Sequence, residues 1–257
     1  QPAAALATYQ AMLGLGEQRS DTTMQVSALN KSAGVLALHM GQFAEADTYL
    51  ARADHLVKQF NEQGGAAESA LIRCQMCTMQ ADFDGVKRHM DNLVAVGQAI
   101  GSLEFQATGM EHIASSLMFM TRFDEAWEKG QEALAVARQI GDLEHQAWLL
   151  ATTLPICLIR DGKLDEAISL TVEGVRIAER IGSLPPQIYG NWNLAEVCRA
   201  RGEYELALEY GQRSLATALP LEDFMPFMVV QPLGTLGSVY QEISPKFIDL
   251  VGQYHLH

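Results

Sequence analysis

The sequence lacks most of the features that mark an enzyme, a membrane protein or a metalloprotein. None of its apolar runs approaches the ~18 residues needed to span a bilayer. It contains no glycine-rich phosphate loop, no nucleophile elbow and no histidine pair at the spacing that binds zinc. We therefore expect no catalytic residue, no metal ligand and no cofactor.

Basic residues are also scarce. The 257-residue chain holds 18 lysines and arginines against 31 aspartates and glutamates, and its formal net charge is −13. Proteins that bind nucleic acids normally present a basic face, because much of their affinity comes from displacing counterions from phosphates. Anionic membrane surfaces attract basic segments for the same reason. The charge balance therefore disfavours both nucleic acid and membrane as partners of this region.

Cysteine is rare, and the four residues of this type are Cys74, Cys77, Cys157 and Cys198. This number does not suggest a disulfide framework in a chain of this length, so we expect a reducing cytoplasm. Cys74 and Cys77 have the two-residue spacing that redox and zinc sites use. Because no second cysteine or histidine pair supplies further zinc ligands, we interpret both as small core residues of a helix.

The chain does contain a short signal that occurs five times, at a spacing of 40 or 41 residues. Each copy has a turn residue, a large apolar residue and, in four copies, an alanine three positions further on. Five copies in register indicate an internal repeat, which determines the architecture before any motif does. The large apolar residues are Phe43, Phe83, Phe123, Leu164 and Tyr204.

A second joint lies between these signals. The segment 100–102, with the sequence Ile-Gly-Ser, recurs in similar form at 140–142 and 181–183. Its glycine can end a helix in the left-handed conformation, and the Ser or Asp can cap the next helix. Two joints per repeat leave two helices of about 15–18 residues, helix A before the large apolar residue and helix B after it. No segment alternates at period two, so we expect no sheet.

Helix A carries small residues at one repeat position, namely Gly34, Cys74, Ala114 and Ala195. Together with the aromatic residue at the A–B turn and the following alanine, they resemble the tetratricopeptide repeat (TPR). The usual TPR period is 34, whereas the joint at 137–142 is similar to long variants. Such variants occur in bacterial transcription activators, cyclase-linked regulators and eukaryotic polarity scaffolds. The resemblance implies an all-α, right-handed α-α superhelix of antiparallel helix pairs, with helix A lining a concave groove.

We expect residues 1–257 to form a single TPR-like solenoid that is a fragment of a longer protein, because the chain has no initiator Met. Neither end carries an obvious polar capping helix, so contacts between copies through the end repeats are an option. In the last partial repeat, Ser244-Pro245 should replace the turn before a short helix at 246–254. The expected repeats are 24–63, 64–101, 102–141, 142–182 and 183–220, with partial repeats at 1–20 and 226–254.

Two segments depart from the repeat. Pro155 lies inside helix A of repeat 4, where it removes a backbone donor and should kink the helix, with Thr152 or Thr153 satisfying the freed carbonyl of Ala151. This is either a tolerated kink or a functional bend. Residues 219–232 hold three prolines in place of the usual joint. They form either an irregular linker or an apolar docking surface.

The resemblance also implies groove positions on helix A. Repeat 5 is the richest, because aromatic and arginine side chains often anchor interfaces; the alternative is that Trp192 packs on the next repeat. Adjacent Glu111 and His112 should point about 100° apart on a helix and form no dyad. The candidate groove residues are Lys31, Gln75, Glu111, Met118, Tyr189, Trp192, Glu196 and Arg199.

These observations favour a non-catalytic interaction module that holds a peptide or protein segment in its groove. Some TPR domains clamp a C-terminal carboxylate with Lys and Asn at successive groove positions. Here Lys31 fits, but the next groove position holds Val35, so that clamp is not supported. The alternative is a ligand- or partner-sensing regulatory domain of a larger bacterial signalling or transcription regulator.

Overall fold

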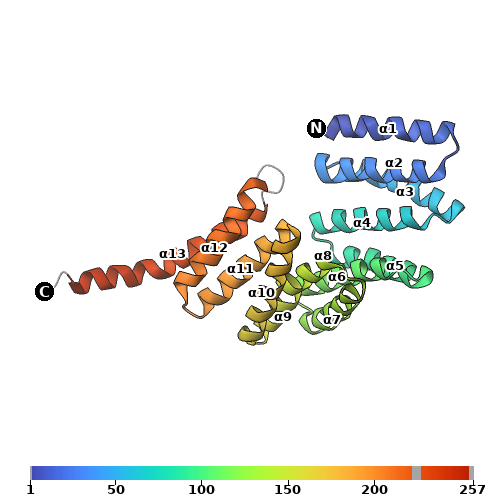
Figure 1. Cartoon of the computed structure of the whole chain (residues 1–257). Coiled ribbons are helices and arrows are strands. Elements are labelled where there is room, and N and C mark those ends of the chain that lie inside the picture. Colours follow the sequence, from blue (N-terminus) through green and yellow to red (C-terminus); the bar gives the residue numbers. More distant parts are fainter. Residues whose placement is uncertain (1, 222–226, 255–257) are drawn as a thin grey trace. The chain divides into compact units, whose positions relative to one another are not determined.

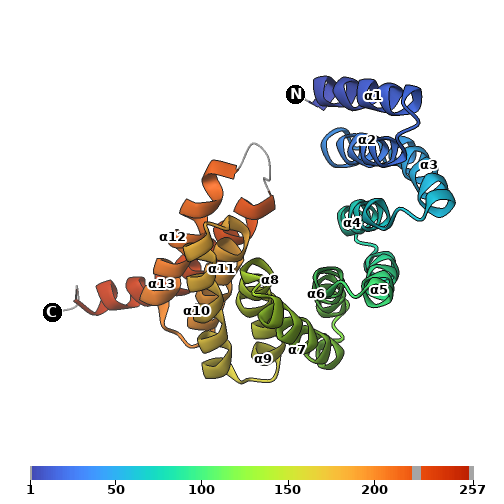
Figure 2. The same ribbon diagram turned by 45° about the vertical axis from the view of Figure 1, so that its right-hand side comes forward.

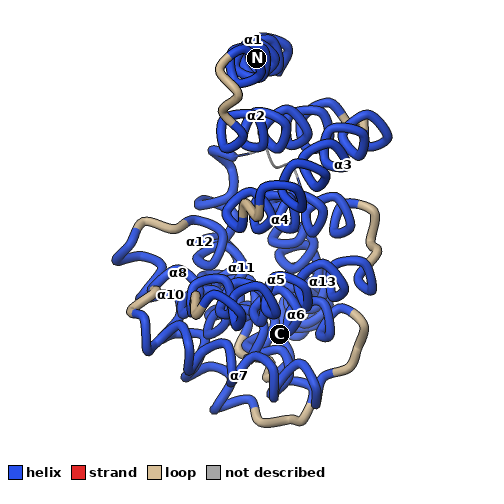
Figure 3. The backbone as a smooth tube through the Cα atoms, turned by 90° about the vertical axis from the view of Figure 1, so that its right-hand side faces the viewer, coloured by secondary structure: helices blue, strands red, loops and turns tan. Residues whose placement is uncertain are grey.

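The computed structural model describes residues 2–221 and 227–254, with side chains described for 2–221 and 228–243. Within these residues the chain is helical throughout apart from short joints, and it has no β-strand (Figure 3). The all-α, helical-repeat fold class predicted from the sequence is confirmed. In the described part of the chain, no helix is long and apolar enough to cross a membrane.

The helices divide into two compact units, residues 1–122 and 123–257. In each unit, successive helices run in opposite directions and pack side by side (Figures 1 and 2). The first unit contains α1 (Pro2–Gln18), α2 (Thr22–Gly34) with the π-helical turn η1 (Val35–His39), α3 (Phe43–Phe60), α4 (Gln63–Met79), α5 (Phe83–Ile100) and α6 (Leu103–Phe119).

The second unit begins with α7 (Phe123–Ile140). Helix A of repeat 4 then consists of α8 (Leu143–Trp148), the π-helical turn η2 (Leu149–Thr153) and α9 (Leu154–Arg160). The remaining elements are α10 (Leu164–Ile181), α11 (Leu184–Ala200), α12 (Tyr204–Ala218), the 3₁₀ turn η3 (Leu219–Leu221) and α13 (Phe227–Tyr254).

The repeat signal marks where each helix B begins. Phe43, Phe83, Phe123, Leu164 and Tyr204 are the first residues of α3, α5, α7, α10 and α12. The alanines three positions later have no exposed surface, since they lie where helices A and B meet. These alanines are Ala46, Ala126, Ala167 and Ala207.

The glycine joints also form as expected. Gly101, Gly141 and Gly182 have φ values of 73°, 71° and 74°. Ser102 and Asp142 then cap α6 and α8 by accepting backbone N–H bonds. The third joint differs, because the Ser183 hydroxyl donates to Glu144 Oε1 at 2.6 Å instead of capping α11.

The A–B turns require a left-handed residue too, but two of them lack glycine. Gly162 and Gly202 have φ values of 74° and 76°, whereas the equivalent positions in earlier repeats hold Ala81 at 56° and Thr121 at 60°. A side chain with a Cβ is strained in this region, and a β-branched one most of all. The backbone conformation of Thr121 is therefore strained, and this strain lowers the stability of the fold.

Close backbone approach is what packs helix A on helix B. The clearest case joins α10 to η2, because a Cβ added at Gly174 would lie 2.4 Å from the backbone N of Ala151. Both residues are buried. Neighbouring Leu149, Leu150 and Leu154 are almost fully buried and fill the space around this contact.

The chain accommodates Pro155 differently from the prediction. Thr152 Oγ1 donates to the carbonyl of Trp148 at 2.6 Å, not to that of Ala151. The Ala151 carbonyl instead accepts a 2.9 Å bond from Nδ2 of buried Asn193, on helix A of the next repeat. The π-helical turn η2 lies just before the proline, although helix A of repeat 1 has a similar turn, η1, without a proline.

The predicted turn at Ser244-Pro245 is wrong, because α13 runs through both residues without a break. A proline removes one backbone bond without necessarily ending a helix. Most of the other joints, in contrast, end the helix with a glycine in the left-handed conformation. Of the proline-rich segment 219–232, η3 and the start of α13 are helical, and 222–226 lie outside the described residues.

We predict that Thr121→Gly raises the free energy of unfolding by about 1 kcal/mol, because glycine adopts the left-handed conformation without strain. Thr48→Gly, at an exposed position within α3, should instead destabilise by about 1 kcal/mol. Urea denaturation measures both variants. Equal losses at the two positions would contradict the strain at Thr121.

We predict that Asn193→Ala destabilises the chain by about 1–3 kcal/mol, because it leaves the buried Ala151 carbonyl without its donor. Pro155→Ala returns a backbone N–H to this helix, so the same asparagine substitution should cost less in that background. The double-mutant cycle is measured by urea denaturation. If Asn193→Ala destabilised the chain equally in both backgrounds, the hydrogen bond of Asn193 would not depend on Pro155.

Candidate functional site

An aromatic row lies across helices A of repeats 4 and 5. The ring centroids of Trp148 and Tyr189 are 5.7 Å apart at 75°, and those of Tyr189 and Trp192 are 6.5 Å apart at 71°. These edge-to-face contacts are the favoured geometry for aromatic pairs. All three side chains are half-buried, so the row presents apolar surface while its members support one another.

Sequence reasoning missed Trp148, although a signal for it was present. Trp148 lies 41 residues before Tyr189 and therefore occupies the same repeat position. The structure joins it to Tyr189 and Trp192, two of the residues taken from the TPR resemblance. Burial raises the pKa of Tyr189, so its phenol is neutral at ordinary pH.

The row ends in a polar network that ties α11 to α13. Trp192 Nε1 donates to Thr235 Oγ1 at 2.8 Å, and this hydroxyl donates to Glu196 Oε1 at 2.5 Å. Arg199 donates from Nη2 to Glu196 at 2.8 Å and from Nη1 to Glu242 at 2.6 Å. The hydrogen bonds that Arg199 donates to Glu196 and then to Glu242 raise the pKa of Arg199.

This network decides how the repeat 5 residues can act. Glu196 and Arg199 are engaged by partners within the chain, so they are ties between repeats as well as surface groups. Trp192 packs toward the next repeat through its N–H, which is the alternative that the sequence left open. Its ring nevertheless stays half-exposed beside Tyr189.

The first unit holds the other four candidates in separate settings. Lys31 is exposed and lies 3.6 Å from Glu68 Oε1, and Gln75 is also exposed. Met118 and Glu111 are buried, with 8% and 5% of their surface exposed. Two of these four candidates are therefore exposed and two are buried.

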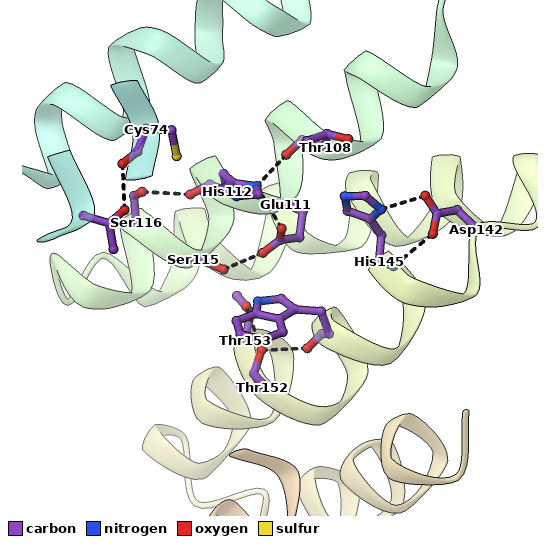
Figure 4. Close-up of polar contacts among 12 residues, drawn as sticks. Cys74, Thr108, Glu111, His112, Ser115, Ser116, Asp142, His145, Thr152 and Thr153 are labelled. Carbon is purple, nitrogen blue, oxygen red and sulfur yellow. Dashed lines mark hydrogen bonds and ion pairs between the residues drawn. The ribbon is translucent and has the colours of Figure 1, made fainter. Parts of the chain in front are cut away.

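Glu111 and His112 do pair, contrary to the expectation from helix geometry (Figure 4). His112 Nδ1 lies 2.9 Å from Glu111 Oε2 and 3.0 Å from the carbonyl of Thr108. Burial lowers the pKa of His112, but the charge and hydrogen bond of Glu111 and the Thr108 carbonyl outweigh it and raise the pKa to about 9. The imidazole folds back along the helix, which the angle between Cα positions alone does not reveal.

This cluster is not arranged as a nucleophile with its base. Ser115 Oγ donates to Glu111 Oε1 at 2.9 Å, and His112 binds the same carboxylate (Figure 4). A serine nucleophile instead needs a neutral base, usually an imidazole nitrogen, at its hydroxyl. In the second unit, Asp142 binds the backbone N–H of His145 at 3.1 Å and its ring Nδ1 at 2.6 Å, which fixes the cap of α8.

The paired cysteines lie on α4, as predicted. Cys74 is buried, and burial, followed by the charges of Glu111 and Cys77, raises its pKa to about 12. A thiol with this pKa is protonated and therefore unsuited to redox or metal chemistry. In the described residues, no group of three or more His, Cys, Asp or Glu side chains is placed to hold a metal ion.

No protein-family model matches the sequence. No curated protein matches it either. Similar folds do occur among solved structures. That of BtubC from P. vanneervenii aligns over 87% of this chain and 93% of its own length, with a TM-score of 0.70 and 13% identity.

Two further similar structures belong to larger proteins. A signal transduction ATPase with numerous domains and a tetratricopeptide repeat sensor, from Pyrococcus horikoshii, covers 94% of this chain with a TM-score of 0.61 and 13% identity. Aspartyl phosphate phosphatase F from Bacillus subtilis covers 91%, with a TM-score of 0.65 and 11% identity. The chain spans 40% of the ATPase and 64% of the phosphatase. At these identities the similarity shows the fold alone, an all-α helical repeat.

We predict that His112→Gln lowers stability most in acid. The folded pKa of about 9 lies above the ordinary value of 6.5, so protonated His112 stabilises the fold fully below pH 6.5. This contribution is lost as the pH rises through 9. Urea denaturation of both proteins on either side of this window measures the difference, with exposed His55→Gln as control. A difference that grows with pH would contradict the pairing.

Proposed function

We propose that this chain is a non-catalytic interaction module that binds a peptide or protein segment on the helix A face of its second unit. The aromatic row Trp148–Tyr189–Trp192 is the observation that carries the proposal. Extended helical repeats suit this task, because residues on one face can vary without disturbing the packing between repeats. The helical-repeat neighbours among solved structures support an interaction or regulatory role of this general kind.

The row has the properties of a binding surface. Tyr and Trp are the residues most enriched in interface hot spots, together with Arg. Because their rings already contact one another edge to face, little side-chain entropy is lost when a partner binds. The hydrogen bond from Trp192 to Thr235 fixes the last ring in the same way. An apolar side chain of the bound segment would lie against these three rings.

The acidic groups beside the row favour particular partners. Glu196 and Glu242 flank Arg199 with side chains 32% and 37% exposed, and the whole chain carries a net charge of −13. A segment with one apolar anchor and neighbouring basic residues would therefore associate most readily.

Selection from a phage-displayed peptide library against the purified chain tests the proposal. We predict that Trp148→Ala weakens binding of the selected peptides at least about tenfold, because one of the three rings of the contact surface is lost. Trp127→Ala on α7 is the matched control, since Trp127 is half-buried and outside the row. Circular dichroism checks that both variants keep their helices.

Two results would refute the assignment to this face. One is that no peptide is enriched over a library selected against denatured chain. The other is that the two tryptophan substitutions weaken binding equally while both variants remain folded.

A second candidate is a ligand- or partner-sensing regulatory domain in a larger bacterial signalling or transcription regulator. The observation that favours it is the fold shared with the ATPase that carries a tetratricopeptide repeat sensor. We place the domain in the cytoplasm, in keeping with four cysteines that are all free. Activity of an attached effector domain, measured with and without the selected peptide, separates a sensor from a passive binder.

A further inference from the structure

A glutamine at the start of helix A closes most of the joints between repeats. Gln25, Gln146 and Gln187 each donate from Nε2 to the carbonyl nine residues earlier, at 3.2, 3.2 and 3.3 Å. These carbonyls lie near the end of the preceding helix, and each also accepts a backbone N–H bond, from Asp21, Asp142 or Ser183. Gln106, at the equivalent position of α6, instead donates to the carbonyl of Ser102, the N-cap of its own helix, at 3.3 Å.

Repeat 2 breaks this pattern. Ala66 lies 41 residues after Gln25 and 40 before Gln106, so it occupies the glutamine position. The carbonyl nine residues earlier belongs to Val57, and like its equivalents in the other joints it accepts backbone N–H bonds, here from Asn61 and Glu62. The joint therefore forms without the glutamine, and the volume of that side chain is left open.

A pocket of about 330 Å³ lies at this place, between α3, α4 and α5. Val57 and Ala66 both line it. Ala67 and Ala70 on α4 contribute small side chains, while Leu93 and Val96 on α5 add apolar surface. The volume is at the lower end of the ~300–1,000 Å³ usual for ligand pockets, which fits a small molecule.

The polar groups of the pocket are mainly donors. Arg73 donates to the two carboxylate oxygens of Asp54 at 2.8 and 3.3 Å. These bonds occupy only part of the five N–H donors of the guanidinium. Lys58 and Asn92 also line the pocket, and no hydrogen bond or ion pair engages either one in the described part of the chain. Burial and then the charges of Arg73 and Arg88 lower the pKa of His89, so this ring is neutral at pH 7.

We propose that this pocket binds a small organic acid with one carboxylate on an apolar body. Two cations face one carboxylate here, which leaves a net positive site in a chain of net charge −13. The ligand carboxylate accepts from Lys58 and from the remaining N–H groups of Arg73, and its apolar part lies on Val57, Ala66, Ala70 and Leu93. The site is independent of the aromatic row and of the peptide binding proposed for it.

The chain itself suggests the decisive variant. Ala66→Gln restores the residue that the other repeats carry at this position, so it should fill the pocket and add a cap without disturbing the fold. Ala44→Gln makes the same change at an exposed position in the first turn of α3, away from the lining residues. Lys58→Gln removes the unpaired charge and keeps a side chain of similar length.

The probes are hexanoate, benzoate and phenylacetate, each compared with its uncharged amide. Saturation-transfer NMR detects binding to the whole chain and gives dissociation constants. We expect at least one acid to bind with a dissociation constant of about 1 mM or tighter, and its amide to bind at least about tenfold more weakly. Ala66→Gln should abolish this binding, Lys58→Gln should weaken it several-fold, and Ala44→Gln should leave it unchanged.

Three outcomes would overturn the proposal. The first is that none of the three acids binds at millimolar concentration. The second is that the amides bind as well as the acids. The third is that Ala66→Gln, with its helical content intact, binds the acid as the wild-type chain does. Because the peptide assay uses other residues, its result does not alter any of these outcomes.

Discussion

Close approach of the two helix backbones within each repeat is the constraint on which this structure depends. It requires small side chains at fixed positions, such as Gly174 against Ala151 and the alanine three residues into most of the second helices. A larger side chain at Gly174 would collide with backbone, which cannot move aside as a flexible side chain can. The 40-residue register follows from this packing, and the register in turn decides which residues reach a surface.

Much of the fold could be read from the sequence, because the packing code is local and repeated. The large apolar residue marked the start of helix B in all five repeats, and the glycines marked most of the joints where helices end. The Asn193 bond to Ala151 was not predictable in this way, because it joins residues 42 apart through a side-chain rotamer. The same limit explains the pairing of Glu111 with His112, which depends on how the imidazole turns.

The candidate site was only partly predictable for a related reason. Family resemblance indicated candidate positions on helix A, but Glu111 and Met118 among them are buried, and it did not indicate which positions are engaged by the next repeat. Glu196 and Arg199 are held in the network between α11 and α13, whereas Trp148 escaped notice although it shares the register of Tyr189. The pocket beside Ala66 emerges only when one joint is compared with the others, atom by atom.

The bond from Asn193 to the carbonyl freed by Pro155 also bears on how such a chain can evolve. Repeat arrays are commonly thought to grow and shrink by duplication or loss of single units, each exchangeable for another. Here repeats 4 and 5 are not exchangeable, because the proline of one depends on the asparagine of the other. Recombination that separated them would leave a buried acceptor unsatisfied, so this pair is expected to be inherited as one block.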